Sequence, residues 1–331
     1  MKVTMKKLTA LLFSLMLVMS FVLSGCSADS GKKEDSTEAP QSTDAAGNEE
    51  DGKKAEDGKD EFQSQILFCG SSSLAPIMAS IGSSFTDEYV TWDKVDPSFP
   101  AENISVYVAP GGSGVGVNSA LEGSCDFGMV ARTVKDEEKA KMSKDYKEYV
   151  MAADALTVSV NKENPVCKVI DDMSTDMIRR IFAGEVTNWK DVDASLPDQE
   201  IAVYIRDLSG GAYEVFQKSV MGESEITASA TQCPSMGALG EAIAGNKWGI
   251  GYASYGVYNQ NKDKLQAMKV DGTEPSEETI IGGKYSIQRP LLFITNSEVS
   301  PAEQAFIDYV YSKAGADAVA ANGYISTMDI K

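Results

Sequence analysis

The chain has 331 residues, and its 49 acidic side chains against 30 basic ones give a formal net charge of −19 at pH 7. Such a charge argues against binding to nucleic acid, because the phosphate backbone would be repelled. The chain also has no histidine, which removes the usual general base near neutral pH and the commonest metal ligand. Hydrolases that use a Ser-His-Asp arrangement are therefore excluded.

Residues 1–25 have the pattern of a secretory signal peptide. Three lysines lie within the first seven residues, and an apolar run follows over residues 8–23. That run is short for a bilayer span, which needs roughly 20 apolar residues. It ends in Leu-Ser-Gly-Cys, and small residues before a cysteine resemble the bacterial lipobox. The resemblance implies that Cys26 is lipidated and becomes the mature N-terminus; an ordinary signal peptide with a chance cysteine is the alternative.

Residues 26–61 are predicted to be a lipidated N-terminus followed by a disordered acidic linker. The stretch after Cys26 is rich in Asp, Glu, Lys, Gly and Ser and contains no aromatic residue and no valine or isoleucine. It cannot bury enough apolar surface to offset the entropy of ordering. We interpret it as a tether between the membrane and residues 62–331, which are long enough for two domains.

In the first half of residues 62–331, the sequence predicts a strand that ends in a polar turn three times, and a helix follows the first two. Residues 63–70 predict a buried strand, and residues 74–89 predict a helix with Ser72 or Ser73 as its N-cap. Residues 104–124 again read as strand, Gly/Ser turn and helix. A third strand is expected over residues 125–132.

Strands that alternate with helices indicate a mainly parallel α/β sheet, in which ligands bind at the carboxyl ends of the strands. Three strand ends would thus bring Ser71–Ser73, Gly111–Gly114 and Arg132 to one edge. Hydroxyls, helix N-termini and an arginine are groups that bind an anion. The further elements are expected, in chain order, as a strand over 155–165, a helix that ends near Gly184, a strand and helix over 201–220, a helix and strand over 235–256, a strand over 289–296 and a helix that begins at Ser300-Pro301.

The remaining cysteines are Cys69, Cys125, Cys167 and Cys233. They show no CxxC spacing, so we expect no zinc site. Cys69 and Cys125 would lie at opposite ends of neighbouring parallel strands, too far apart to bridge. We expect the four to be free or weakly paired.

Seven stretches carry a resemblance to a known family. They read GSSSLAP (70–76), GGSGVG (111–116), DFGMVAR (126–132), VNKENP (160–165), IFAGEVTNW (181–189), GIGYAS (249–254) and RPLLFITN (289–296). In sequence and order they resemble the PstS-like family, the phosphate-binding lipoproteins of the bacterial phosphate ABC transporter.

The resemblance implies a two-domain periplasmic-binding-protein fold of type II, with mostly parallel sheets flanked by helices and a ligand cleft between the domains. Domain one would comprise 62–155 and 290–331, and domain two 156–289. The chain would cross near Leu156–Val160 and near Arg289–Ile294. The implied protein is a monomer without a cofactor, lipid-anchored at the extracellular face of the cell membrane, that delivers inorganic phosphate to ABC permease and ATPase subunits.

The resemblance also assigns phosphate-binding groups to the turns after the strands. In domain one they are Ser73, Leu74, Ser113, Gly114 and Arg132, and in domain two Arg206, Ser209, Gly210 and Gly211.

The domain-two turn departs from the family pattern Arg-x-x-Gly-Ser-Gly-Thr. Here Gly210, Ala212 and Tyr213 stand where the serine, the threonine and an optional arginine are usual. The aspartate that would accept a proton from phosphate is also missing from the third turn, and Asp207 is a possible replacement. The anion is therefore phosphate, sulfate, phosphonate or a similar oxyanion. Two other hypotheses are a secreted serine phosphatase and a surface protein that has lost ligand binding.

Overall fold

The computed structural model describes residues 62–330. The predictions of a signal peptide, of lipidation at Cys26 and of a linker over 26–61 lie outside the described residues. Within 62–330, no helix is both long enough and apolar enough to cross a membrane.

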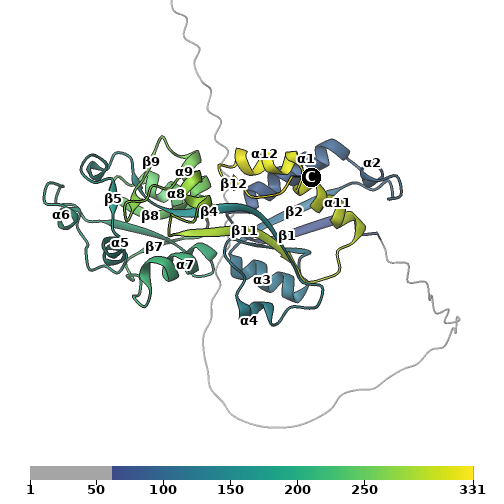
Figure 1. The fold of residues 1–331 in the computed structure, drawn as a ribbon, viewed down its shortest axis with the longest axis horizontal. Helices are drawn as coiled ribbons and strands as arrows, with labels where there is room; N and C mark the ends of the chain where they lie inside the picture. Colours follow the sequence, from purple (N-terminus) through teal and green to yellow (C-terminus); the bar gives the residue numbers. More distant parts are fainter. Residues whose placement is uncertain (1–61, 331) are drawn as a thin grey trace, which may run out of the picture. The chain divides into compact units, whose positions relative to one another are not determined.

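The strands alternate with helices along the chain (Figure 1). The strands are β1 (Gln65–Ser71), β2 (Ser105–Gly111), β3 (Phe127–Val130), β4 (Lys147–Asn161), β5 (Asp172–Met173), β6 (Ala202–Arg206), β7 (Thr231–Cys233), β8 (Gly249–Ser254), β9 (Leu265–Ala267), β10 (Lys269–Val270), β11 (Gln288–Thr295) and β12 (Ile325–Ser326). The helices are α1 (Ala75–Tyr89), α2 (Trp92–Val95), α3 (Ser113–Glu122), α4 (Asp136–Lys139), α5 (Thr175–Phe182), α6 (Trp189–Val192), α7 (Gly211–Phe216), α8 (Met236–Gly245), α9 (Tyr255–Gln260), α10 (Glu277–Ile281), α11 (Pro301–Val310) and α12 (Lys313–Ala321), with a 3₁₀ turn at Pro165–Lys168 and a π turn at Gln217–Met221.

One mixed sheet has the strand order β2-β1-β3-β11-β4-β8-β6-β7. The pairs of β1 with β2 and β3, and of β6 with β7 and β8, are parallel. Strands β4 and β11 pair antiparallel to each other over most of the length of β11. The predicted α/β fold is therefore confirmed, and the antiparallel strands in the middle make the sheet mixed rather than mainly parallel.

The hydrophobic core is divided into two main clusters. One contains Ile66, Phe68 and Phe293, and the other contains Phe182, Phe216 and Tyr252. We call the elements around the first cluster lobe one (β1–β3, α1–α4, α11, α12) and those around the second lobe two (β5–β10, α5–α10). Figure 1 shows α3 and α4 on one face of the lobe-one strands and α1 and α12 on the other.

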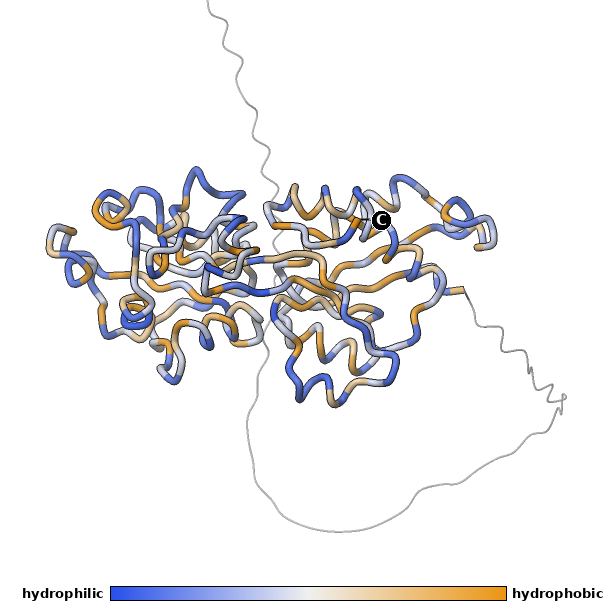
Figure 2. The backbone as a smooth tube through the Cα atoms, in the orientation of Figure 1, coloured by the Kyte–Doolittle hydropathy of each residue, from blue (hydrophilic) through white to orange (hydrophobic). Residues whose placement is uncertain are grey.

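Strands β4 and β11 belong to both lobes. In β4, Met151 and Ala152 pack in the lobe-one core, and Leu156 and Val158 pack in the lobe-two core. Figure 2 shows orange, hydrophobic positions along this central region, whereas α4, Asp136–Lys139, is blue. Most of residues 151–161 of β4 and most of β11 are buried, so a charged side chain in these stretches needs a partner inside the protein.

Two predicted helix starts have different outcomes. The start of α11 is confirmed, because Ser300 caps it, Glu303 completes the capping box and Pro301 follows. The predicted cap of α1 is wrong: the N-cap residue is Leu74, which makes no side-chain cap. The hydroxyl of Ser71 instead accepts the N–H groups at the turn, so the next two serine hydroxyls are left for other partners.

All four cysteines in the described residues are free. Burial, together with the neighbouring Cys69 thiol, raises the pKa of the Cys125 thiol to about 12. The prediction of free cysteines is confirmed. Cys69 lies toward the end of β1 and Cys125 just before β3, as expected, but the inferred large separation is wrong because the two thiols interact.

Candidate functional site

Three strand ends of lobe one form the first wall of the candidate site. Ser73 and Ser113 are 3% and 1% exposed. The Ser113 Oγ accepts the N–H of Ala131 at 3.0 Å, which ties the start of α3 to the end of β3. Gly70 has a φ of +122°, and a β-carbon there would lie 2.4 Å from the Met129 carbonyl oxygen. Only glycine lets β1 turn this close to β3.

Lobe two supplies a buried arginine at the end of β6. The Nη1 of Arg206 donates to Ser72 Oγ of lobe one at 2.6 Å, and its Nε donates to the Cys233 carbonyl at 3.1 Å. The N–H of Met236, at the start of α8, reaches the same Ser72 oxygen at 3.3 Å. Arg206 is 2% exposed, so its charge is held inside the protein beside the first turn of lobe one.

Asp207 balances that charge. Its Oδ2 accepts Arg206 Nη2 at 2.8 Å, and its Oδ1 accepts the N–H and hydroxyl of Ser209 at 3.0 and 2.5 Å. Burial raises the pKa of Asp207, but hydrogen bonds from Ser209 and Arg206 bring it below its ordinary value. An ionised Asp207 whose oxygens already have these donors is a poor acceptor for a proton on a ligand.

The glycine turn before α7 touches lobe one. A β-carbon on Gly211 would lie 2.2 Å from Ser113 Oγ, and one on Gly112 would lie 2.1 Å from the Ser209 carbonyl oxygen. Gly210 is the N-cap residue of α7. Glycine is therefore needed on both sides for the two turns to meet. The structure brings together Ser73, Leu74, Ser113, Gly114, Arg206, Ser209, Gly210 and Gly211.

Arg132 does not point toward these serines. Its Nη1 and Nη2 each donate to Glu138 at 2.8 Å, and its Nε donates to Glu214 of lobe two at 3.1 Å. Lys135 pairs with the other oxygen of Glu214 at 2.6 Å. Contact between Arg132 and an anion stays a prediction, and its observed role is an ion pair between the lobes.

Ala212 and Tyr213 also take part in packing. Ala212 is 2% exposed in the lobe-two core, and Tyr213 packs against the same cluster. The two side chains that replace the family's threonine and arginine thus face the core at least in part.

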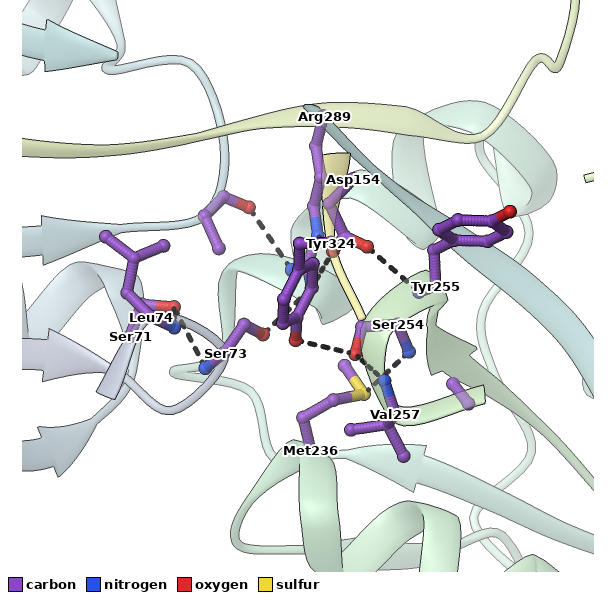
Figure 3. Close-up of polar contacts among 12 residues, drawn as sticks. Ser71, Ser73, Leu74, Asp154, Met236, Ser254, Tyr255, Val257, Arg289 and Tyr324 are labelled. Carbon is purple, nitrogen blue, oxygen red and sulfur yellow. Dashed lines mark hydrogen bonds and ion pairs between the residues drawn. The ribbon is translucent and has the colours of Figure 1, made fainter. Parts of the chain in front are cut away.

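Figure 3 shows a buried polar network that the sequence interpretation did not assign to the site. Arg289 on β11 forms an ion pair with Asp154 on β4, with its Nε and Nη2 at 2.8 Å from Oδ2. The two residues face each other in the register of the strands. Arg289 also donates from Nη2 to Ser73 Oγ at 2.9 Å and from Nη1 to the Ala131 carbonyl at 3.2 Å.

The same network joins the lobes at a second point. Asp154 accepts the Tyr255 N–H at 2.9 Å, and the hydroxyls of Ser254 and Tyr324 lie 2.9 Å apart. Burial raises the pKa of Asp154, and the Arg289 guanidinium opposes that shift. One signal for this pair was present in the sequence: Asp154 is a single acid within the apolar run 150–160. A charge in such a run needs a buried partner.

The arrangement can hold a small anion by donors alone. Two helices of 15 and 10 residues, α1 and α3, begin at the serine turns, so their free N–H groups and dipoles point to this region. Arg206 and Arg289 add guanidinium donors that are always charged. An oxyanion, which only accepts hydrogen bonds, fits such surroundings.

Comparison with known proteins agrees with this geometry. The PBP superfamily domain matches residues 39–314. The chain is 34% identical over 271 residues to the phosphate-binding protein PstS of Staphylococcus haemolyticus, covering 78% of this chain and 80% of that protein. The chain belongs to the PBP superfamily and, within it, to the PstS-like family.

Further relatives extend this finding. The PstS of Staphylococcus aureus strain USA300 is 31% identical over 271 residues, 78% of this chain and 77% of that protein. A crystal structure of a putative phosphate ABC transporter substrate-binding protein from Clostridium perfringens, with bound phosphate, has 28% identity and a TM-score of 0.68. That similarity covers 80% of this chain and 99% of that one. The resemblance inferred from the motifs is confirmed.

Proposed function

We propose that this protein captures inorganic phosphate in the cleft between its lobes and delivers it to an ABC permease. The observation that carries the proposal is the convergence of donors from both lobes on one buried place. Ser73 and Ser113 come from lobe one, and Arg206 and the turn over 209–211 come from lobe two. The phosphate-binding relatives and the phosphate-bound C. perfringens structure support the same ligand.

The proposed ligand contacts come from the turns described above. Ser73 and Ser113 would donate hydroxyl protons. The turn at Ser209, Gly210 and Gly211 and the main chain at Leu74 and Gly114 would line the anion. Arg206 would supply the charged donors.

We also propose the domain division inferred from the sequence, with domain one at 62–155 and 290–331 and domain two at 156–289. Because β4 and β11 run through both lobes, they are suited to act as the hinge. The contacts of Arg206 with Ser72 and of Arg132 with Glu214 would then belong to the closed form. A ligand that bridges the lobes would favour that form over an open one.

The proposed location is the extracellular face of the cell membrane, with a lipid on Cys26 as the anchor and the protein acting as a monomer. The role is binding without catalysis. In support, the PstS relatives are named as binding proteins, and the chain lacks a histidine that would activate a serine nucleophile.

Calorimetric titration of the purified chain with inorganic phosphate tests the proposal. We expect saturable binding of one phosphate per chain and no hydrolysis of a phosphate monoester. Absence of a binding signal with phosphate would refute the ligand assignment, and turnover of the ester would favour a phosphatase.

A second candidate is a binding protein for a proton-free oxyanion such as sulfate. The observation that favours it is that Asp207 and Asp154, the carboxylates that bind Arg206 and Arg289, already accept protein donors. A site without a free hydrogen-bond acceptor cannot bind the proton on a hydrogen-bearing phosphate, so it discriminates less between phosphate and sulfate. Titrations with sulfate, arsenate and a phosphonate under the same conditions separate the two candidates.

A further inference from the structure

One guanidinium group bonds Ser73 directly and is linked to Ser113 through the backbone of Ala131. The Nη2 of Arg289 donates to Ser73 Oγ at 2.9 Å. Its Nη1 donates to the Ala131 carbonyl at 3.2 Å, and the N–H of that same Ala131 donates to Ser113 Oγ at 3.0 Å. A single side chain from β11 thus fixes two turns of lobe one that are 40 residues apart in sequence, at 73 and 113.

The direction of these hydrogen bonds is unambiguous. An arginine side chain and a backbone N–H can only donate, so both serine oxygens are acceptors in these contacts. Each hydroxyl therefore keeps its own proton for another partner, and at Ser73 the neighbouring Tyr324 hydroxyl is one such partner besides a ligand. An oxyanion accepts protons at every unprotonated oxygen, so both serines are set up as donors to it.

The guanidinium itself is held in place from the other side. Asp154 on β4 binds it at 2.8 Å and also accepts the Tyr255 N–H at 2.9 Å. Arg289 is 4% exposed and Asp154 is 0% exposed. The ion pair with Asp154 therefore fixes the position of the Arg289 guanidinium inside the protein. Figure 3 shows the Arg289 side chain extending from β11 past Asp154 toward Ser73.

We propose that Arg289, clamped by Asp154, is a positioning residue for anion binding: it orients the Ser73 and Ser113 hydroxyl protons toward the ligand without itself supplying the main ligand contact. This inference rests on the proposed function, since it takes the two serines as ligand donors. It adds a specificity element, because hydroxyls fixed as donors favour the less protonated form of phosphate.

The test is a thermodynamic cycle on the full chain, read by calorimetry with inorganic phosphate. Arg289→Lys keeps the charge beside Asp154 but cannot bridge Ser73 and Ala131 with a planar fork. We expect it to weaken phosphate binding at least tenfold. Arg179→Lys is the matched control, because Arg179 pairs only with groups at the surface of lobe two, and it should leave the affinity within twofold.

The cycle separates positioning from a merely structural role. Ser73→Ala and Ser113→Ala are each combined with Arg289→Lys. If Arg289 acts through these hydroxyls, the loss in each double variant is at least threefold smaller than the product of the two single losses. The inference would be overturned if the losses of phosphate affinity multiply in full in both cycles. It would also be overturned if Arg289→Lys binds phosphate with wild-type affinity.

A folding control keeps the test decisive. Thermal unfolding without ligand shows whether Arg289→Lys is folded. If it is not, the pair Arg289→Met with Asp154→Asn takes its place in the cycle, because that pair leaves no unpaired buried charge. A failure of the unchanged chain to bind phosphate, sulfate or arsenate refutes the proposed function and this inference together, whereas additive losses refute the inference alone.

A pH series adds a second readout. With both hydroxyls fixed as donors, phosphate affinity of the unchanged chain should rise as the pH rises through the second ionisation of phosphate. In Arg289→Lys the Ser73 hydroxyl loses its guanidinium donor and is free to accept as well as donate, so the rise should be at least threefold smaller. Equal pH profiles for the two proteins would contradict the orienting role.

Discussion

Gly211→Ala should block the meeting of the two lobes while leaving each lobe intact. A β-carbon at this position would lie 2.2 Å from Ser113 Oγ, and ordinary contact begins near 3.4 Å, so the turns must separate by 1.2 Å (3.4 minus 2.2). Hydrogen bonds of about 2.9 Å across the ligand would stretch to about 4 Å and be lost. Two such bonds to an anion, at about 1.5–3 kcal/mol each, amount to a loss of about 10²- to 10⁴-fold in affinity.

Calorimetry with inorganic phosphate measures this loss, and thermal unfolding without ligand measures the stability. Because Gly211 is the first residue of α7 and its φ lies outside the left-handed region, alanine should leave the unliganded protein as stable as before or slightly more so. Gly245→Ala is the matched control, since a β-carbon there meets nothing within 4 Å. Phosphate affinity of Gly211→Ala within threefold of the control would refute the reasoning.

Four further changes test other parts of the proposal. Arg206→Ala should weaken phosphate binding by at least 10-fold, because it removes charge-assisted hydrogen bonds of about 1.5–3 kcal/mol each; near-unchanged affinity in calorimetry would contradict the assignment. Glu214→Gln should raise the phosphate dissociation rate about two- to fivefold by weakening the pair with Arg132, and stopped-flow fluorescence that shows no change would count against a closed-state contact. Asp207 has a lowered pKa in the folded protein, so the stability it contributes is present above the ordinary carboxylate pKa and is lost as the pH falls through the lowered value; Asp207→Asn should flatten the acid side of the unfolding profile. Cys26→Ser should release the protein from the membrane fraction, and retention there would mean that the lipid anchor is wrong.

The lobe-one wall of the site could be predicted from the sequence because it depends on local order. Buried strands that end in Gly/Ser turns and lead into helices have their carboxyl ends at one edge of a parallel sheet. The register of β1 with β2 and β3 places Ser71 opposite Gly111 and Gly70 opposite Met129, as that rule requires. The pairing of β1 with β2 and β3 is therefore sufficient to bring the serine turns together.

The partners of the charged residues could not be predicted in this way. Arg132 stands at a strand end like the serines, but its side chain is long and binds Glu138 and Glu214, which the fold brings beside it. Arg289 and Asp154 lie on strands 135 residues apart in sequence, and only the antiparallel pairing of β4 with β11 puts them opposite each other. Local sequence patterns predict where a strand ends. Ion pairs depend on which strands become neighbours in the sheet, and local patterns do not predict that.

The buried charges explain how an acidic protein can hold an anion. Arg206 is paired with Asp207 and Arg289 with Asp154, so each ion pair carries little net charge. The attraction must then come from directed N–H and O–H groups, which act over a few ångströms and depend on geometry. Donors of this kind are effective only when the turns of both lobes meet around the ligand. In the proposed site, affinity would therefore depend on closure of the lobes, and the glycines at the meeting point would be as important to binding as the arginines.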